Sequence, residues 1–169
     1  MVDNEEPKES ILGILRSAIN IEKFGIRYYQ ALSSAVEDDN GKALLNFLID
    51  AESDHQRTLE QEYDKHKELG DEALKPLPLD NLEEEGDITI FSESLEDYDP
   101  TSVSAKDAIK FGMHVEERSI RFYSMAAKVI NAPELLDILN YLIDYEKDHL
   151  ELLKKNLNRL ETEDTWFGY

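Results

Sequence analysis

Two glutamate–histidine pairs are the part of the sequence best suited to chemistry. LIDAESDH occupies residues 48–55 and LIDYEKDH occupies residues 142–149, so each octapeptide contains the pattern Glu-x-x-His. A glutamate and a histidine three positions apart lie on one face of a helix, where their carboxylate and imidazole can reach the same metal ion. The chain has four histidines, and a single match among four would be close to the chance level. The spacing of the two copies is therefore needed to distinguish a metal-binding motif from a chance match.

The chain repeats at one offset. Each residue of the second octapeptide follows its counterpart by 94 positions, and the same shift places EKFGIRYY on EERSIRFY. Glu22 then corresponds to Glu116, and Tyr29 corresponds to Tyr123. In each half, 30 positions separate this single glutamate from the glutamate of Glu-x-x-His. The sequence predicts a duplicated helical hairpin.

Helical periodicity supports the duplication. Apolar residues recur at steps of three and four, as in amphipathic helices. Ser104 with Asp107 resembles a capping box, Asn131 with Glu134 can cap the last helix, and Pro133 suits its first turn. Short connections within each half predict antiparallel hairpins. The predicted helices cover residues 10–36, 42–66, 104–130 and 133–160.

The middle of the chain predicts a long connection. Residues 67–103 carry three prolines, many acidic residues and the short apolar run ITIF. This length suits a crossover along a four-helix bundle, with the apolar run on the bundle surface. We expect residues 1–169 to form one all-α domain, in which the hairpins 10–66 and 104–160 pack together. A disordered linker between separate hairpins is the alternative, although a lone hairpin buries little apolar surface.

Six polar side chains interrupt helix faces that are otherwise apolar. A buried, unpaired carboxylate is costly, so it takes up a proton or pairs with a cation. The same faces contain no lysine or arginine, and two divalent ions would neutralise four carboxylates. Mixed oxygen and imidazole ligands suit iron or manganese, whereas structural zinc sites usually contain sulfur. The predicted metal ligands are Glu22, Glu52, His55, Glu116, Glu146 and His149.

Composition excludes several classes of function. The net charge is −20, from 38 acidic and 18 basic residues, and it disfavours binding to nucleic acid. The absence of cysteine excludes disulfides, thiolate metal sites and thiol nucleophiles. The sequence has no run of about 18 apolar residues, and from its acidic first residues we expect no secretory leader. We expect a cytoplasmic protein that does not bind membranes.

At these residues the chain resembles the ferritin-like di-iron carboxylate superfamily and, within it, the rubrerythrin-like group. The resemblance covers about residues 10–160 and implies a ferritin-like four-helix bundle with one long crossover. It implies two bound iron ions, with manganese or a mixed pair as the alternative. The roles that it implies are terminal carboxylates at Glu22 and Glu116, bridging carboxylates at Glu52 and Glu146, and one imidazole per metal from His55 and His149.

The resemblance also concerns residues beside the ligands. Tyr29 and Tyr123 match tyrosines that hydrogen-bond a ligand carboxylate in such sites, with plain core packing as the alternative. Two features differ from full-length rubrerythrins: the chain lacks the four cysteines of a rubredoxin domain, and Ser119 stands where many have an additional glutamate. The ligand set is therefore closer to the symmetric six-ligand site of bacterioferritins.

The expected function is oxidoreductase chemistry in iron handling or oxidative stress. Ferrous iron would be oxidised by peroxide or oxygen, or peroxide would be reduced with electrons from a separate donor protein. Metal storage or buffering without turnover is one alternative, and a metal-free structural bundle is another. We expect a homo-oligomer, most simply a dimer.

Other conspicuous residues are not assigned to the site. His66 is expected to be solvated near a helix end, and His114 is expected to face away from the predicted ligands. The aromatic residues Trp166, Phe167 and Tyr169 are expected to fold back onto the bundle or onto a partner subunit.

Overall fold

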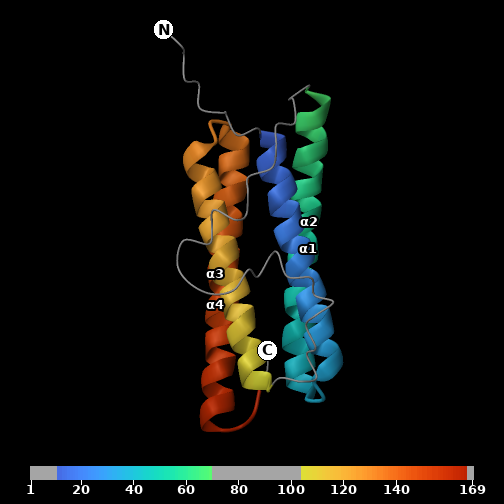
Figure 1. Cartoon of the computed structure of the whole chain (residues 1–169), viewed down its shortest axis with the longest axis vertical. Coiled ribbons are helices and arrows are strands. Elements are labelled where there is room, and N and C mark those ends of the chain that lie inside the picture. The colour runs from blue at the N-terminus through green and yellow to red at the C-terminus, as the bar shows by residue number, and fades with distance from the viewer. Residues whose placement is uncertain (1–10, 70–103, 167–169) are drawn as a thin grey trace, which may run out of the picture.

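The computed structural model describes residues 11–69 and 104–166, which form an elongated bundle of helices (Figure 1). The predicted all-α fold is confirmed. The predicted crossover lies almost wholly outside the described residues, and so does its apolar run. The four helices are α1 (Ile11–Ala35), α2 (Asp39–Glu68), α3 (Ala105–Val129) and α4 (Pro133–Thr162).

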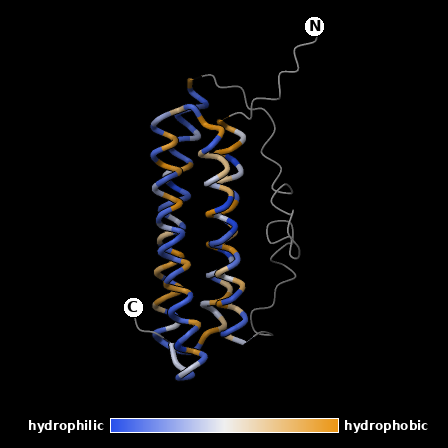
Figure 2. The backbone as a smooth tube through the Cα atoms, turned by 90° about the vertical axis from the view of Figure 1, so that its left-hand side faces the viewer, coloured by the Kyte–Doolittle hydropathy of each residue, from blue (hydrophilic) through white to orange (hydrophobic). Residues whose placement is uncertain are grey.

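The helices are arranged as two hairpins lying side by side. Helix α1 packs along α2 and α3 packs along α4, while α1 with α3 and α2 with α4 join the two hairpins (Figure 1). In the perpendicular view, apolar and polar residues alternate along every helix (Figure 2), as expected when one face of each helix is buried. None of the described helices is long and apolar enough to cross a membrane.

Two helix starts follow from side-chain caps. The Asp38 carboxylate accepts hydrogen bonds from the backbone N–H groups of Asn40 and Gly41, at 2.9 and 3.0 Å, and α2 begins immediately afterwards. The Ser104 hydroxyl accepts the N–H of Asp107 at 3.1 Å, so the predicted cap of α3 is confirmed. These bonds satisfy N–H groups that have no partner within the helix.

The start of α4 corrects a prediction. Ala132, not Asn131, is the cap residue, and its side chain makes no capping hydrogen bond. Pro133 occupies the first turn as predicted. A proline forces the preceding residue into an extended conformation, and Ala132 has φ −94° and ψ 110°. Pro133 therefore defines the boundary, and Asn131 lies one position too early to cap the helix.

The apolar core has two parts, one toward each end of the bundle. One cluster includes Leu15, Leu59 and Leu139, and the other includes Leu45 and Leu153. The six predicted ligands come from the middle of the helices, between these clusters. Two apolar layers thus enclose a polar centre.

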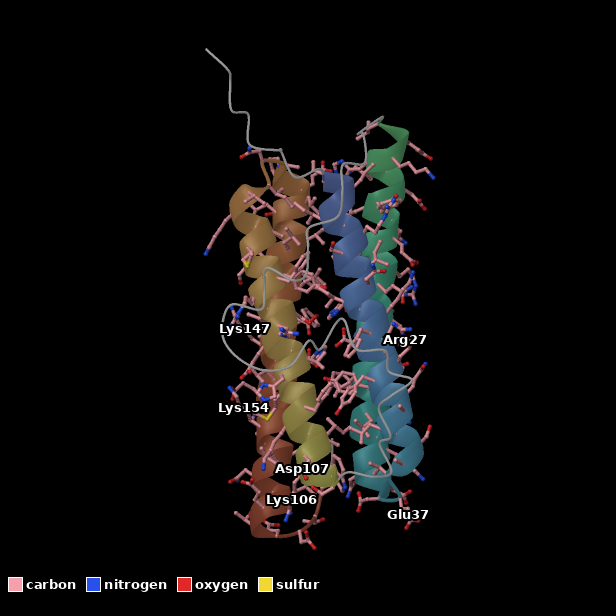
Figure 3. The ribbon with its side chains drawn as sticks, in the orientation of Figure 1. Arg27, Glu37, Lys106, Asp107, Lys147 and Lys154 are labelled. Carbon is pink, nitrogen blue, oxygen red and sulfur yellow. The ribbon has the colours of Figure 1, made fainter. Side chains whose placement is uncertain are left out.

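The outer faces carry the charge. Arg27, Lys147 and Lys154 are exposed and lie on the outside of the bundle (Figure 3). The tail behaves as predicted at Trp166, which is 6 % exposed and packs against the start of α2 at Gly41. Phe167 and Tyr169 lie outside the described residues.

Candidate metal centre

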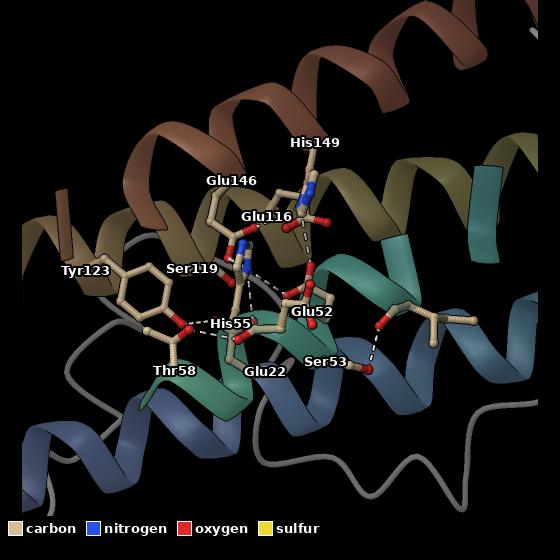
Figure 4. Close-up of polar contacts among 12 residues, drawn as sticks. Glu22, Glu52, Ser53, His55, Thr58, Glu116, Ser119, Tyr123, Glu146 and His149 are labelled. Carbon is tan, nitrogen blue, oxygen red and sulfur yellow. Dashed lines mark hydrogen bonds and ion pairs between the residues drawn. The ribbon is translucent and has the colours of Figure 1, made fainter. Parts of the chain in front are cut away.

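The structure brings all six predicted ligands together in the middle of the bundle (Figure 4). Helices α1 and α3 each contribute one glutamate, and α2 and α4 each contribute one Glu-x-x-His pair. The three-residue step places both side chains of each pair on the inward face. All six residues are at most 3 % exposed: Glu22, Glu52, His55, Glu116, Glu146 and His149.

The six side chains form two overlapping groups. Glu22 and His55 belong to one group, Glu116 and His149 belong to the other, and Glu52 belongs to both. Glu146 is likewise shared. Within each group one possible ligand atom per residue lies within 4.8 Å of all the others. Two metal positions with two carboxylates between them would produce this overlap.

The histidine Nδ1 atoms face the carboxylates. Nδ1 of His55 lies 3.5 Å from Glu22 Oε2, 3.6 Å from Glu52 Oε2 and 3.8 Å from Glu146 Oε1. Nδ1 of His149 lies 3.2 Å from Glu146 Oε2 and 3.4 Å from Glu52 Oε1. Most of these separations exceed a good hydrogen bond. They match the separation of neighbouring ligands on one ion, where each donor lies about 2 Å from the metal.

Unsatisfied atoms test whether a cation fits. Glu22 Oε2, Glu146 Oε1 and His55 Nδ1 are buried without a hydrogen-bond partner among residues 11–69 and 104–166. A buried polar atom without a partner costs free energy that a bound cation would recover. The residues present therefore fit a metal, and oxygen and imidazole donors suit iron or manganese. Metal binding by these six residues remains a prediction.

Two tyrosines connect the hairpins at the site. The Tyr29 hydroxyl of α1 donates a hydrogen bond to Glu116 Oε1 of α3, and the Tyr123 hydroxyl of α3 donates one to Glu22 Oε1 of α1. Both tyrosines are fully buried. Each hydroxyl therefore orients a carboxylate that belongs to the opposite hairpin.

Burial favours the protonated form of three of the carboxyl groups without metal. Burial, and next the charge of Glu52, raises the pKa values of Glu22 and Glu146 well above the ordinary value. The same two causes raise the pKa of Glu116 to about 7. A cation that binds between these groups would replace their protons.

The remaining charges in the site are of opposite sign. Burial alone would raise the pKa of Glu52, but close polar contacts with Glu22, His149 and His55 outweigh it and lower the pKa. Burial would lower the pKa of His55, but the carboxyl groups of Glu22 and Glu52, 3.5 and 3.6 Å away, raise it to about 10. The pKa of His149 is also raised, because its contact with Glu52 at 3.4 Å outweighs burial. The raised pKa values favour the protonated, positively charged imidazoles beside Glu52 in the metal-free protein.

Two small residues occupy equivalent positions of the repeat beside the site. A Cβ atom on Gly25 would lie 3.5 Å from Cδ of Glu52. The 94-residue shift maps Gly25 onto Ser119, which is 3 % exposed and donates its hydroxyl to the Val115 carbonyl at 3.1 Å. Neither position supplies a seventh carboxylate.

The two other histidines lie outside this centre. The prediction that His66 is solvated is wrong: the residue is 9 % exposed, with Nε2 3.9 Å from Glu62 Oε2. Helix α2 continues to Glu68, so the face that carries His55 remains covered at His66. His114 is exposed and lies 3.3 Å from Glu117, facing away from the site as predicted.

Sequence reasoning missed several aromatic neighbours of the site. Tyr145 and Tyr141 contact His55 edge-to-face, and Phe47 contacts His149. The repeat could have indicated two of them, because the 94-residue shift maps Phe47 onto Tyr141 and so places an aromatic residue at the same position in each half. Their contacts with the histidines depend on packing between α2 and α4, which the repeat does not specify.

Comparison with known proteins supports the fold and the family. A hypothetical protein from Pyrococcus furiosus has a TM-score of 0.69 at 21 % identity, covering 96 % of this chain and 97 % of its own. A protein from Thermotoga maritima described as a ferritin-like diiron-carboxylate protein has a TM-score of 0.68 at 20 % identity, covering 95 % and 100 %. At these identities the likeness shows the fold, which is that of ferritin-like four-helix bundles. No curated protein matches the chain. The sequence model of the Rubrerythrin family matches residues 13–157, and the chain therefore belongs to the rubrerythrin family.

Proposed function

We propose that this chain is a non-haem di-iron protein. In it, peroxide or oxygen oxidises ferrous iron, or peroxide is reduced with electrons from a separate donor protein. The observation that carries the proposal is the pair of overlapping ligand groups that share Glu52 and Glu146. Membership of the rubrerythrin family and the likeness to a ferritin-like diiron-carboxylate protein support it.

The chemistry follows from what each part of the chain does. Two iron ions bound here would supply electrons to an oxidant and binding positions for its oxygen atoms. Glu52 and Glu146 belong to both ligand groups, so they would hold both ions. Tyr29 and Tyr123 restrain the outer carboxylates by donating hydrogen bonds to them. The apolar clusters on either side limit the access of water to the centre.

The proposed metal binding is coupled to the release of protons. Glu22, Glu116 and Glu146 have raised pKa values without metal. Metal loading therefore releases protons from these groups. Loading should weaken as the pH falls, because protons compete with the cation for the same oxygen atoms.

The partners of the reaction are part of the proposal. The chain contains no cysteine that could relay electrons from within. We therefore propose a separate electron donor protein, with a homo-oligomer, most simply a dimer, as the working assembly in the cytoplasm.

Metal analysis followed by rapid kinetics tests the proposal. Protein purified without added metal is analysed for bound iron and manganese, and it is then loaded anaerobically with two ferrous ions per chain. Stopped-flow mixing with peroxide, and separately with oxygen, should oxidise this iron faster than free ferrous ion under the same conditions. His55→Ala and His149→Ala should each slow the oxidation, whereas His114→Ala, on the exposed face of α3, should not.

Two results would contradict the proposal. Saturation well below two metals per chain would remove the two-metal site. Binding of two irons that react no faster than free iron would indicate storage or buffering. Sustained peroxide reduction with an added donor, without growth of an iron core under excess iron, would identify the peroxidase form of the function.

A further inference from the structure

Helix α4 carries a pair of exposed tyrosines one turn apart. Tyr141 is 48 % exposed and Tyr145 is 42 % exposed. Their ring centroids are 4.4 Å apart and the rings are tilted by 39°. Large aromatic side chains are usually covered, so two of them in contact on the outer surface require a reason.

The pair also contacts the metal centre. The ring of Tyr145 lies 5.5 Å from that of His55 at an interplanar angle of 87°, and the ring of Tyr141 lies 6.3 Å away at 82°. His55 is itself 2 % exposed, with Nδ1 directed at the site carboxylates. A continuous chain of aromatic rings therefore leads from the buried site to solvent.

The second half of the site lacks this path. The 94-residue shift maps Tyr141 onto Phe47 and Tyr145 onto Ala51. The ring centroids of Phe47 and His149 are 6.2 Å apart and the rings are inclined by 86°. The contact between Tyr141 and His55 therefore has a counterpart of the same geometry in the other half. Phenylalanine has no hydroxyl proton to lose, and alanine has no ring. The two halves therefore differ in side chains that can be oxidised.

The buried tyrosines are poorly placed for the same task. The hydroxyls of Tyr29 and Tyr123 donate to the ligand carboxylates and are fully enclosed. A tyrosine that loses an electron also loses its hydroxyl proton, which here would pass to the bonded carboxylate, so the radical would stay enclosed and out of reach of a soluble reductant. Tyr141 and Tyr145 lie at the surface, where water can accept the proton.

We propose that Tyr141 and Tyr145 form a one-electron exit, through which an oxidising equivalent left at the metal centre reaches the surface and is removed by a small soluble reductant. This inference rests on the proposed peroxide chemistry and adds a second class of reductant, beside the donor protein, and its point of contact. The geometry that carries it is the ring chain from His55 to solvent, present in one half of the repeat.

The electrons and protons balance as follows. One peroxide molecule needs two electrons and two protons to become two water molecules, with cleavage of its O–O bond. A chain that holds one ferrous ion supplies one electron from iron. The second electron comes from Tyr141 or Tyr145, whose hydroxyl proton passes to water, leaving a neutral tyrosyl radical. Bulk water supplies the two protons that peroxide takes up. A one-electron reductant such as ascorbate then returns an electron and a proton to the tyrosyl radical.

Freeze-quench electron paramagnetic resonance tests the inference. Full-length protein carrying one ferrous ion per chain is mixed with hydrogen peroxide without a reductant and is frozen within milliseconds to seconds. The wild type should give a tyrosyl signal that ascorbate removes. The double substitution Tyr141→Phe with Tyr145→Phe keeps both rings and should lose most of this signal. The matched control is Tyr63→Phe, on α2 and away from the six ligands, which should keep it.

A second measurement uses only the wild type. A nitroso spin trap is present during the peroxide reaction, and the trapped residues are identified by peptide mass spectrometry. Adducts on Tyr141 or Tyr145 support the exit. Adducts confined to Tyr29 or Tyr123 overturn it, as does a signal of full size in the double variant.

Iron oxidation, measured in the same samples and in protein loaded with two ferrous ions per chain, separates the two proposals. Iron oxidised by peroxide with no tyrosyl signal overturns the exit and leaves the proposed function standing. If peroxide oxidises the iron of the doubly loaded protein no faster than free ferrous ion, the proposed function is overturned, and the exit with it.

Discussion

Tyr29 and Tyr123 orient the outer carboxylates of the site by hydrogen bonds that cross between the hairpins. Outer partners of this kind set the orientation of a ligand, and their loss typically weakens metal binding by about 10- to 100-fold. The double substitution Tyr29→Phe with Tyr123→Phe should therefore weaken metal binding by roughly tenfold or more, measured by competitive titration with a chelator. The neighbour Tyr28 provides the control, because it is equally buried but donates to the Ala108 carbonyl at 2.5 Å. An equal loss of metal affinity in Tyr28→Phe would contradict the specific role of the two hydroxyls.

Glu52 and Glu146 are the two carboxylates shared by both ligand groups. Ferrous or manganous ion at about 100 times its dissociation constant should stabilise the fold by about 2.7 kcal/mol, which is roughly 5–10 °C in melting temperature for a chain of this size. Replacing both residues with glutamine should remove most of this rise, because amides bind such ions weakly. The matched control replaces Glu60 and Glu151 of the same two helices, whose side chains are 45 % and 60 % exposed. A rise that survives the first double change would place the stabilising ions elsewhere.

At the scale of elements, the start of α2 is fixed by its cap and by the C-terminal tail. A Cβ atom on Gly41 would lie 2.7 Å from Cε2 and 2.8 Å from Cδ2 of Trp166. These ring atoms cannot bend away, so the whole indole must move. Alanine usually stabilises a helix relative to glycine by up to about 1 kcal/mol. At Gly41 the clash with the indole should make alanine destabilising instead.

Gly41→Ala should therefore lower the melting temperature and shift the tryptophan emission to longer wavelength as the indole becomes solvated. The chain has one tryptophan, so the emission reports on this contact alone. Lys42→Ala, at the exposed neighbouring position, should change neither property. Stabilisation by Gly41→Ala with unchanged emission would show that the tail does not pack there in solution.

At the scale of the whole molecule, the hairpins meet around a centre whose carboxyl groups hold protons. Burial raises the pKa of Glu116 to about 7, against an ordinary value of 4.5, and it also raises the pKa values of Glu22 and Glu146. The folded protein therefore binds more protons than the unfolded chain above pH 4.5. Stability falls as pH rises wherever the folded state holds more protons.

Metal-free protein should accordingly be more stable near pH 5 than near pH 8. The contribution of Glu116 alone is on the order of 3 kcal/mol across this range. The raised pKa of His55 acts in the same direction between about pH 6.5 and 10, whereas the lowered pKa of Glu52 removes stability below pH 4.5. Urea denaturation at several pH values measures the trend. Glu116→Gln should reduce the dependence of the free energy of unfolding on pH, and it should be more stable than the wild type at pH 8. An unchanged pH dependence would count against protonation at this residue.

The sequence alone identified the elements and the six side chains that converge. Helical periodicity determined which faces are buried, because a residue every three or four positions must lie on one side of a helix. The repeat doubled each signal, so Glu52 with His55 and Glu146 with His149 could be distinguished from chance pairs. The cap at Ser104 was readable because a capping bond spans three residues.

Only the tertiary structure decided what lies between the helices. The hydrogen bonds of Tyr29 and Tyr123 join residues that are distant in sequence, and so does the contact of Tyr145 with His55. The burial of His66 depends on where the helices end. Periodicity fixes the direction of a side chain around its own axis, but not the depth or rotation at which two helices meet. These quantities are set by packing of the whole core, to which every helix contributes at once.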